Sequence, residues 1–195
     1  MSPRRGLDIQ VILETAAEIA NQEGAEAITL AALAKKLHIK PPSLYNHVEG
    51  LSGLQKKLAV YGLEQLLKEL TKASVGRAGN EAVHSLAEAY VSFVRKQPGL
   101  YELTLKAPGE GDSDYHIVAE QLVELLTSVF RAYHLREEAA IHAVRGIRSL
   151  LHGFTSLEQK GGFGLPVDLD VSFRLMIDTF LAGINQSKEM KGQPQ

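Results

Sequence analysis

Helical spacing of apolar residues constrains this chain more than any other feature. Apolar side chains recur three and four positions apart along most of its length, and no alternating run is long enough to predict a β-strand. From Asp8 to Glu23 the apolar residues follow one helical face, and Gly24 stands where a helix would end. The periodicity therefore predicts an all-α fold of about nine helices.

The same signals divide the rest of the chain into helices. Thr29 is placed to cap a short helix, "LAALAKKL", and Pro41 and Pro42 begin the next one. Further helices are predicted over 51–73, 80–97, 113–134 and 137–159, with a last helix beginning at Asp168 or Asp170. A short segment, "LYELTLK", precedes a flexible stretch at 107–112.

Composition limits the cellular setting. The 195 residues, 45% of them hydrophobic, suffice for one ordinary domain or for a small module joined to a larger one. The absence of cysteine excludes disulfides and thiol nucleophiles. Because we find neither an apolar stretch of membrane-spanning length nor a secretory signal, we expect a soluble, cytoplasmic protein with no membrane partner.

The stretch "KPPSLYNHV" predicts a recognition helix. Prolines suit the first turn of a helix, and helical spacing turns Leu44 and Val48 inward. The opposite side then carries amide, hydroxyl and ring groups, whereas a solvated face is normally rich in Lys and Glu. Together with the "LAALAKKL" helix and the turn at "HIK", where His38 would adopt positive φ, this segment predicts a helix-turn-helix.

In such a motif the second helix enters the major groove of DNA. Its asparagine can pair with adenine, its serine can donate or accept, and its tyrosine and histidine can reach phosphates or stack. The two prolines can press on thymine methyl groups. The predicted DNA-binding residues are Thr29, Lys36, Lys40, Pro41, Pro42, Ser43, Tyr45, Asn46, His47 and Lys56.

The charge distribution supports a local rather than a general affinity for DNA. Residues 1–57 carry seven Lys and Arg against six Asp and Glu, a net charge of +1, whereas the remainder carries fourteen against seventeen, or −3. Arg4 and Arg5 precede the motif and could clamp the backbone, adding salt dependence to binding. A patch at the N-terminal end is therefore expected to bind double-stranded DNA.

Two other classes of function compete with DNA binding. An enzyme is disfavoured because His134, His142 and His152 are eight and ten residues apart, which is not the spacing of helical zinc ligands, and no phosphate loop or nucleophile elbow is present. We therefore expect no catalytic residue, metal or cofactor. A helical adaptor or scaffold that uses its helix-turn-helix on a protein remains the alternative.

The stretch "ITLAALAKKLHIKPPSLYNHVEGLSGL" resembles the DNA-binding region of the tetracycline-repressor-like (TetR) family of bacterial transcription regulators. This resemblance implies an obligate homodimer, a three-helix DNA-reading head and a C-terminal domain that binds a small ligand. The family usually has a lysine just after the loop that follows the recognition helix, where this chain has Leu51, so Lys56 or Lys57 would substitute. "LLHGFTSLEQKGGFGLPVDLDVSF" is similar to a subgroup named for a Trp-His-Gly signature, although the chain has no tryptophan.

On this interpretation the chain divides into a helix-turn-helix domain (1–50), a helical effector-binding and dimerisation domain (51–187) and a flexible tail (188–195). Polar groups that interrupt apolar faces suggest an effector site at His84, Tyr90, Phe93, Tyr101, Thr104, His116 and Gln121. Two apolar stripes on 137–159 and a Phe-rich last helix suggest a four-helix dimer bundle involving Ile147, Leu151, Phe154, Phe173, Met176 and Phe180. The expected function is a repressor whose affinity for its operator falls when an effector binds.

Overall fold

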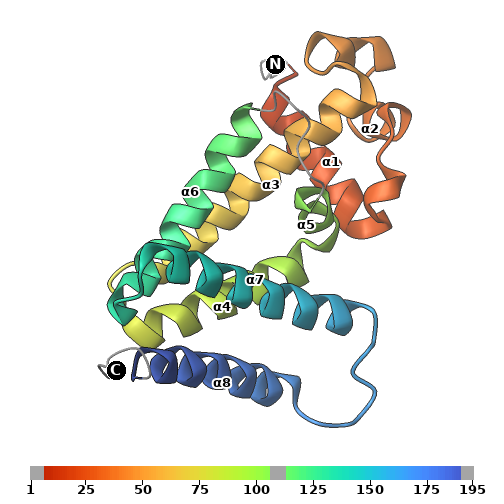
Figure 1. Ribbon diagram of the computed structural model, residues 1–195. Coiled ribbons are helices and arrows are strands. Elements are labelled where there is room, and N and C mark those ends of the chain that lie inside the picture. Colours follow the sequence, from red (N-terminus) through yellow and green to blue (C-terminus); the bar gives the residue numbers. More distant parts are fainter. Residues whose placement is uncertain (1–6, 106–112, 190–195) are drawn as a thin grey trace. The chain divides into compact units, whose positions relative to one another are not determined.

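The computed structural model describes residues 7–105 and 113–189, and within these ranges the chain is all-α with no strand (Figure 1). Arg4, Arg5, the predicted flexible stretch 107–112 and residues 190–195 of the predicted tail lie outside the described residues. The α-helices are α1 (Ile9–Glu23), α2 (Leu30–Lys36), α3 (Gly50–Ser74), α4 (Gly79–Lys96), α5 (Pro98–Thr104), α6 (Ser113–Phe130), α7 (Glu137–Gln159) and α8 (Leu169–Glu189). The 3₁₀ helices are η1 (Ala25–Ala27), η2 (Pro41–Asn46) and η3 (Arg131–Tyr133).

Local capping explains where several helices begin and end. The Asp8 carboxylate accepts from the backbone N–H of Gln10 at the start of α1, and Gly24, at φ 93°, ends that helix by donating its N–H to Ala20 O. At the start of α8 the Asp168 carboxylate accepts from the N–H of Asp170 at 2.8 Å. α8 continues to Glu189, and the predicted tail over 188–195 stays a prediction.

The chain forms two compact units. The first comprises Met1–Leu66 and Lys96–Ala119, and the second comprises Leu67–Arg95 and Glu120–Gln195, as far as these ranges are described. The chain passes between the units within α3, α4 and α6, so each crossing is a helix rather than a loop. The predicted boundary at residue 50 separates a DNA-binding domain from an effector-binding and dimerisation domain, and it stays a prediction. None of the described helices combines the length and apolarity needed to cross a membrane.

The core of the first unit joins α1 to the helix-turn-helix. Ile12, Ala16 and Ile19 on α1 are almost completely buried, as are Leu33 on α2 and Leu44 on η2. Leu54 and Leu58 from the first turns of α3 belong to the same fully buried set. Burial of such side chains contributes about 1.5–3 kcal/mol each, which fixes the short helices α2 and η2 although neither is long enough to be stable alone.

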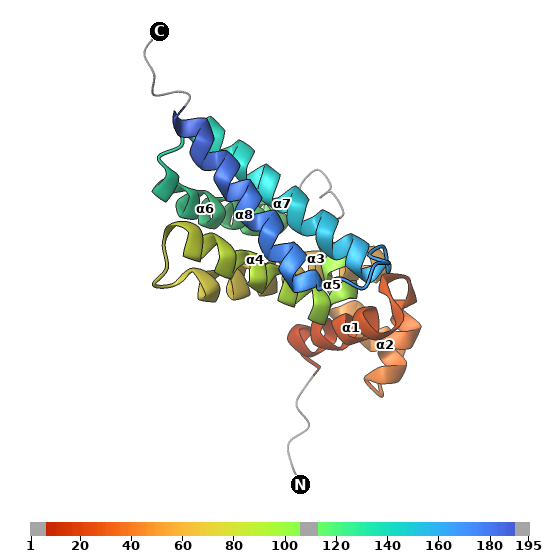
Figure 2. The same ribbon diagram turned by 90° about the horizontal axis from the view of Figure 1, so that it is seen from below.

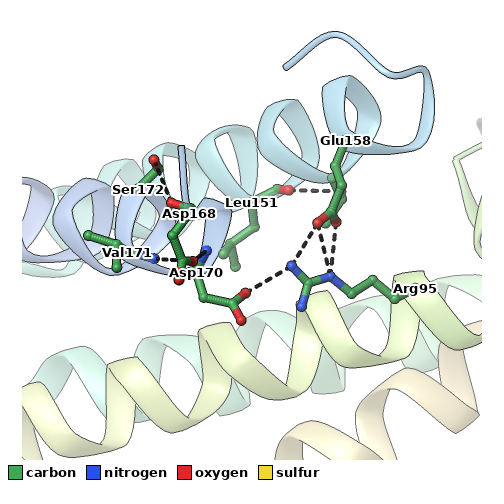
Figure 3. A network of polar contacts seen from close by, with 8 residues as sticks. Arg95, Leu151, Glu158, Asp168, Asp170, Val171 and Ser172 are labelled. Carbon is green, nitrogen blue, oxygen red and sulfur yellow. Dashed lines mark hydrogen bonds and ion pairs between the residues drawn. The ribbon is translucent and has the colours of Figure 1, made fainter. Parts of the chain in front are cut away.

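In the second unit α7 and α8 run antiparallel, side by side (Figures 1 and 2). The rings of Phe154 and Phe173 pack with their centroids 5.2 Å apart between these helices. At the carboxyl end of α4, Arg95 donates three hydrogen bonds to Glu158 on α7, two of them from Nε and one from a terminal nitrogen, and it donates one to Asp170 on α8 (Figure 3). This ion-pair network joins three helices around the α7–α8 connection.

Candidate nucleic-acid interface

The predicted recognition helix is present, but it is a 3₁₀ helix over Pro41–Asn46 rather than an α-helix. Two successive prolines remove two backbone donors from a six-residue helix, and the remaining bonds are short-range: Ser43 N–H donates to Lys40 O and His47 N–H to Leu44 O. Side chains three residues apart eclipse in a 3₁₀ helix. Pro42 and Tyr45 therefore lie above one another along the helix axis, and so do Ser43 and Asn46 on the adjacent side.

The helix is oriented as the sequence predicted. Leu44 and Val48 are buried at 0% and 2% exposure, whereas Tyr45 is 62% exposed. Pro41, Pro42 and Asn46 are exposed too, and Ser43 and His47 are half-buried. The exposed face thus presents an amide, a phenol and two proline rings, the groups that can meet base edges and thymine methyl groups.

The turn and the cap that position η2 also match the sequence. His38 adopts φ 55° between α2 and η2, in the left-handed region that the turn requires. The Thr29 hydroxyl accepts from Ala32 N–H at 3.0 Å as the N-cap of α2. Because the hydroxyl accepts in that bond, its own proton stays available for a phosphate oxygen.

The lysines around the helix-turn-helix differ in their environment. Lys36 is engaged on its own protein, since its Nζ lies 3.2 Å from Glu18 Oε2 and 3.4 Å from Gln22 Oε1. Lys40 and Lys56 are exposed. Contact between any of these lysines and DNA stays a prediction; a phosphate would have to compete with Glu18 for Lys36.

The residues predicted to bind an effector fall in different places. His84, Tyr90, Phe93 and Gln121 lie in the second unit, and Tyr101, Thr104 and His116 lie in the first. Within α5 the Thr104 hydroxyl donates to Tyr101 O at 2.7 Å, and both side chains are buried. His84 Nε2 lies 2.9 Å from Asp178 Oδ1. The binding of an effector by these residues stays a prediction.

The residues predicted to meet a partner subunit largely fill the second unit itself. Ile147, Leu151, Phe154 and Phe173 are each 4–6% exposed, and Met176 and Phe180 are half-buried. The outer face of α8 instead presents Val171 and Leu175, at 61% and 65% exposure. A contact between the predicted residues and a partner stays a prediction.

The structure also shows features that sequence reasoning missed. A groove of about 760 Å³ in the first unit is lined by residues from α1, η2, α3, α5 and α6, including Ile9, Asn46 and Leu103. Tyr61 lines it too, and burial, followed by the nearby Glu14 and Glu64 carboxylates, raises the pKa of this tyrosine. None of the residues predicted to bind an effector is part of its lining.

Metal-binding clusters are not found in the described parts of the chain, where no three His, Asp or Glu side chains are grouped as ligands. All buried side-chain polar atoms of the described residues have a hydrogen-bond partner.

Comparison with protein families gives two matches. A family described as "Tetracyclin repressor-like, C-terminal domain" matches residues 83–180, and one described as "Bacterial regulatory proteins, tetR family" matches residues 12–47. The second range contains α2 and η2 and most of α1. The resemblance to the Trp-His-Gly subgroup stays a prediction.

Two relatives match over nearly the whole chain. The "Uncharacterized HTH-type transcriptional regulator YobS" of Bacillus subtilis is 45% identical over 185 residues, which cover 94% of this chain and 96% of that protein. The "Uncharacterized HTH-type transcriptional regulator Rv0681" of Mycobacterium tuberculosis is 32% identical over 181 residues, covering 92% of this chain and 83% of that protein.

Solved structures share the fold at lower identity. A protein from Rhodococcus sp. RHA1 aligns with a TM-score of 0.77 at 22% identity, covering 94% of this chain and 98% of that one. The TetR family transcriptional regulator PfmR from Thermus thermophilus aligns with a TM-score of 0.66 at 21% identity, covering 88% and 97%. A TetR protein from Acinetobacter baumannii, solved in complex with minocycline, gives 0.67 at 20%, covering 92% and 97%.

Proposed function

Because this chain belongs to the TetR family of DNA-binding transcriptional regulators, we propose that it is a homodimeric repressor whose operator affinity is lowered by a small-molecule effector. Members of this family regulate transcription rather than catalyse reactions. The proposal has three parts: the residues that contact the operator, the surface that forms the dimer, and the action of the effector. Its cytoplasmic location follows from the DNA that it would bind.

One observation carries the operator contacts: η2 buries Leu44 completely while it exposes Tyr45 and Asn46. An exposed face without long charged side chains is unusual for a merely solvated helix. Asn46 is suited to bidentate contact with adenine, and Tyr45 to a phosphate or a thymine methyl group. We assign base reading to these two residues, with Ser43 and the prolines beside them.

The test begins by selecting a duplex from a random library with the wild-type protein. We expect Asn46→Ala to weaken binding to the selected duplex by about tenfold or more, because a good bidentate base contact contributes about 1–3 kcal/mol. Asn185→Ala, at an exposed asparagine of α8, is the matched control and should bind as the wild type does. Retained specific binding by both Asn46→Ala and Tyr45→Ala would exclude the assigned contacts.

Salt dependence separates the regulator from the adaptor. Each lost phosphate contact lowers the slope of log affinity against log salt by about one. We therefore expect a smaller slope for Lys40→Ala and an unchanged slope for Lys68→Ala, an exposed lysine of the second unit. Salt-insensitive association with a protein, together with no selected duplex, would favour the adaptor instead.

The dimer is proposed to form through α7 and α8. Val171 and Leu175 stand one turn apart on the exposed face of α8, with Thr179 a further turn along. Met176 and Phe180 are still accessible at the edge of this face. Two copies that pack these helices together would form a four-helix bundle and would present two reading helices to a two-fold symmetric operator.

The dimer predicts a specific disruption. Leu175→Glu places a charge in the proposed contact, so we expect the dimer dissociation constant, measured by sedimentation, to rise more than about tenfold. Val75→Glu changes an apolar residue that is 70% exposed in the α3–α4 connection, and it should leave the dimer intact. A Leu175→Glu dimer of wild-type strength would show that this face of α8 is not the contact.

The effector is expected to act on the domain that follows the helix-turn-helix. A panel of apolar small molecules, added to the complex with the selected duplex, should include compounds that release the DNA. Repression is tested in cells, where removal of the protein should raise expression from a promoter that carries the selected site. Lower expression on removal would identify an activator.

A further inference from the structure

The end of α1 is joined to the start of α5 by a single side chain. Asn21 donates from Nδ2 to Gln97 Oε1 at 2.6 Å, and its Oδ1 accepts from the backbone N–H of Leu100 at 3.0 Å. These partners are 76 and 79 residues away in sequence, and both bonds are partly buried. Both the nitrogen and the oxygen of the Asn21 amide are therefore hydrogen-bonded where the end of α1 meets the start of α5.

This contact completes the first turn of α5. The residue before the helix, Gln97, makes no side-chain cap bond, and Pro98 at the first position has no N–H. The backbone N–H of Leu100, the third residue of α5, donates to the Asn21 side chain instead. Since a seven-residue helix is unstable alone, its cap is supplied from α1.

The backbones of the two helices touch at the same place. A Cβ added to Gly99 would lie 1.9 Å from Ala20 O and 2.9 Å from Asn21 N, closer than any side chain could be accommodated. Gly99 is also buried. The absence of a side chain lets α5 approach α1 until Asn21 reaches Leu100, so the joint has little freedom to slide.

The joint lies within the first unit, just after the point where the chain enters that unit from α4. Arg95 is the last residue of α4 in the second unit, the chain enters the first unit at Lys96, and Gln97 comes next. The other helix of the joint, α1, packs against α2, and α2 packs against η2. Because α1 supports α2 and α2 supports η2, the position of α1 bears on the orientation of η2.

We propose that Asn21 is a positioning residue, which holds α1 to the α4–α5 corner and so keeps η2 in the orientation that operator DNA requires. The proposal rests on the proposed function, since it assigns Asn21 a part in the same DNA binding. Asn21 touches neither bases nor phosphates in this role. It acts through the orientation of α1.

Two variants at this position separate hydrogen bonding from side-chain size. Asn21→Leu removes both bonds and keeps the number and branching of the side-chain heavy atoms, although leucine is larger. Asn21→Asp keeps the acceptor for Leu100, and the Gln97 amide, turned over, can donate its N–H to the second carboxylate oxygen. Glu23→Ala, at an exposed residue two positions along α1, is the control for a nearby substitution.

The first readout needs no DNA. In Asn21→Leu we expect the backbone amide of Leu100 to exchange with solvent at least about tenfold faster, and the amides of Ser43, His47 and Val48 around η2 to accelerate as well. Asn21→Asp and Glu23→Ala should keep all four slow. Acceleration confined to Leu100 would overturn the proposal, because Asn21 would then be only a cap for α5.

The second readout is affinity for the selected duplex. Asn21→Leu should bind it about tenfold more weakly at a temperature where circular dichroism shows it folded, with an unchanged salt slope, because no phosphate contact is lost. Wild-type affinity in folded Asn21→Leu would overturn the proposal. If the wild-type protein selects no duplex, the proposed function fails, and the exchange data alone decide whether Asn21 positions η2.

Gln97→Leu provides an independent route if Asn21→Leu does not fold. It removes one of the two bonds and leaves the cap on Leu100. We expect Gln97→Leu to bind the selected duplex several-fold more weakly than the wild type, with an unchanged salt slope, because no phosphate contact is lost. Wild-type affinity in folded Gln97→Leu would contradict the role of the joint.

Discussion

At the scale of single residues, a few positions carry constraints that local chemistry explains. His38 is held at φ 55° in the turn before η2, and its side chain is exposed. Histidine reaches the left-handed region more readily than bulky residues do, but less freely than glycine. The sequence predicted this conformation because the two short helices leave room for only a tight turn.

The strain at His38 predicts an ordering of variants. Since the side chain is exposed, substitutions there act mainly on the backbone. We expect His38→Val to lower the free energy of unfolding by about 1 kcal/mol relative to His38→Asn, because β-branched residues are poorly accommodated at positive φ. Urea denaturation of the two variants measures the difference, and equal midpoints would contradict the strain.

At the scale of helices, the second unit depends on how the ends of α4, α7 and α8 are joined. Arg95 lies in a network with Glu158 and Asp170, and its hydrogen bonds with Glu158 raise the pKa of the guanidinium, so the arginine is always charged (Figure 3). The two carboxylates are not equivalent. Glu158 is 19% exposed and accepts three hydrogen bonds from Arg95, whereas Asp170 is 68% exposed and accepts one.

This asymmetry predicts which of the two carboxylates contributes more to the stability of the protein. We expect Glu158→Gln to destabilise the protein by about 1 kcal/mol, and Asp170→Asn by only a few tenths, because exposed ion pairs are weakened by water and salt. The loss in Glu158→Gln should shrink as salt is added. Thermal unfolding at low and high ionic strength measures both effects, and equal losses for the two variants would contradict this account.

At the scale of the molecule, each compact unit contains a tyrosine that is harder to ionise in the folded protein than in the unfolded chain. Burial raises the pKa of Tyr61 in the first unit and that of Tyr133 in the second. The Tyr133 hydroxyl also donates to Asn80 Oδ1 at 2.6 Å, which a phenolate cannot do. Both units should therefore lose stability in alkaline solution.

The direction of this effect follows from linkage. A phenol whose pKa is raised by folding contributes its full stability below the unfolded value near 10, and loses it as pH rises through the folded value. We expect the free energy of unfolding to fall above about pH 10, and to fall less steeply in Tyr133→Phe. Denaturant titrations across that range measure it; identical slopes for the two proteins would contradict the role of Tyr133.

The sequence by itself determined the helices and the direction in which the recognition helix faces. Helical periodicity and caps such as Thr29 act over a few residues, so they can be read locally, and the inward placement of Leu44 follows from the same spacing. Family membership, predicted from the motif around η2, is shown by the comparisons. The DNA contacts remain predictions that the variants above would decide.

Only the tertiary structure decided which faces meet. An apolar stripe predicts burial without identifying what covers it: Ile147 and Phe173 are buried within their own unit, and their predicted contact with a partner stays a prediction. Asn21 gave no signal in the sequence, because its two bonds reach across 76 and 79 residues and exist only once Gly99 has brought α5 against α1.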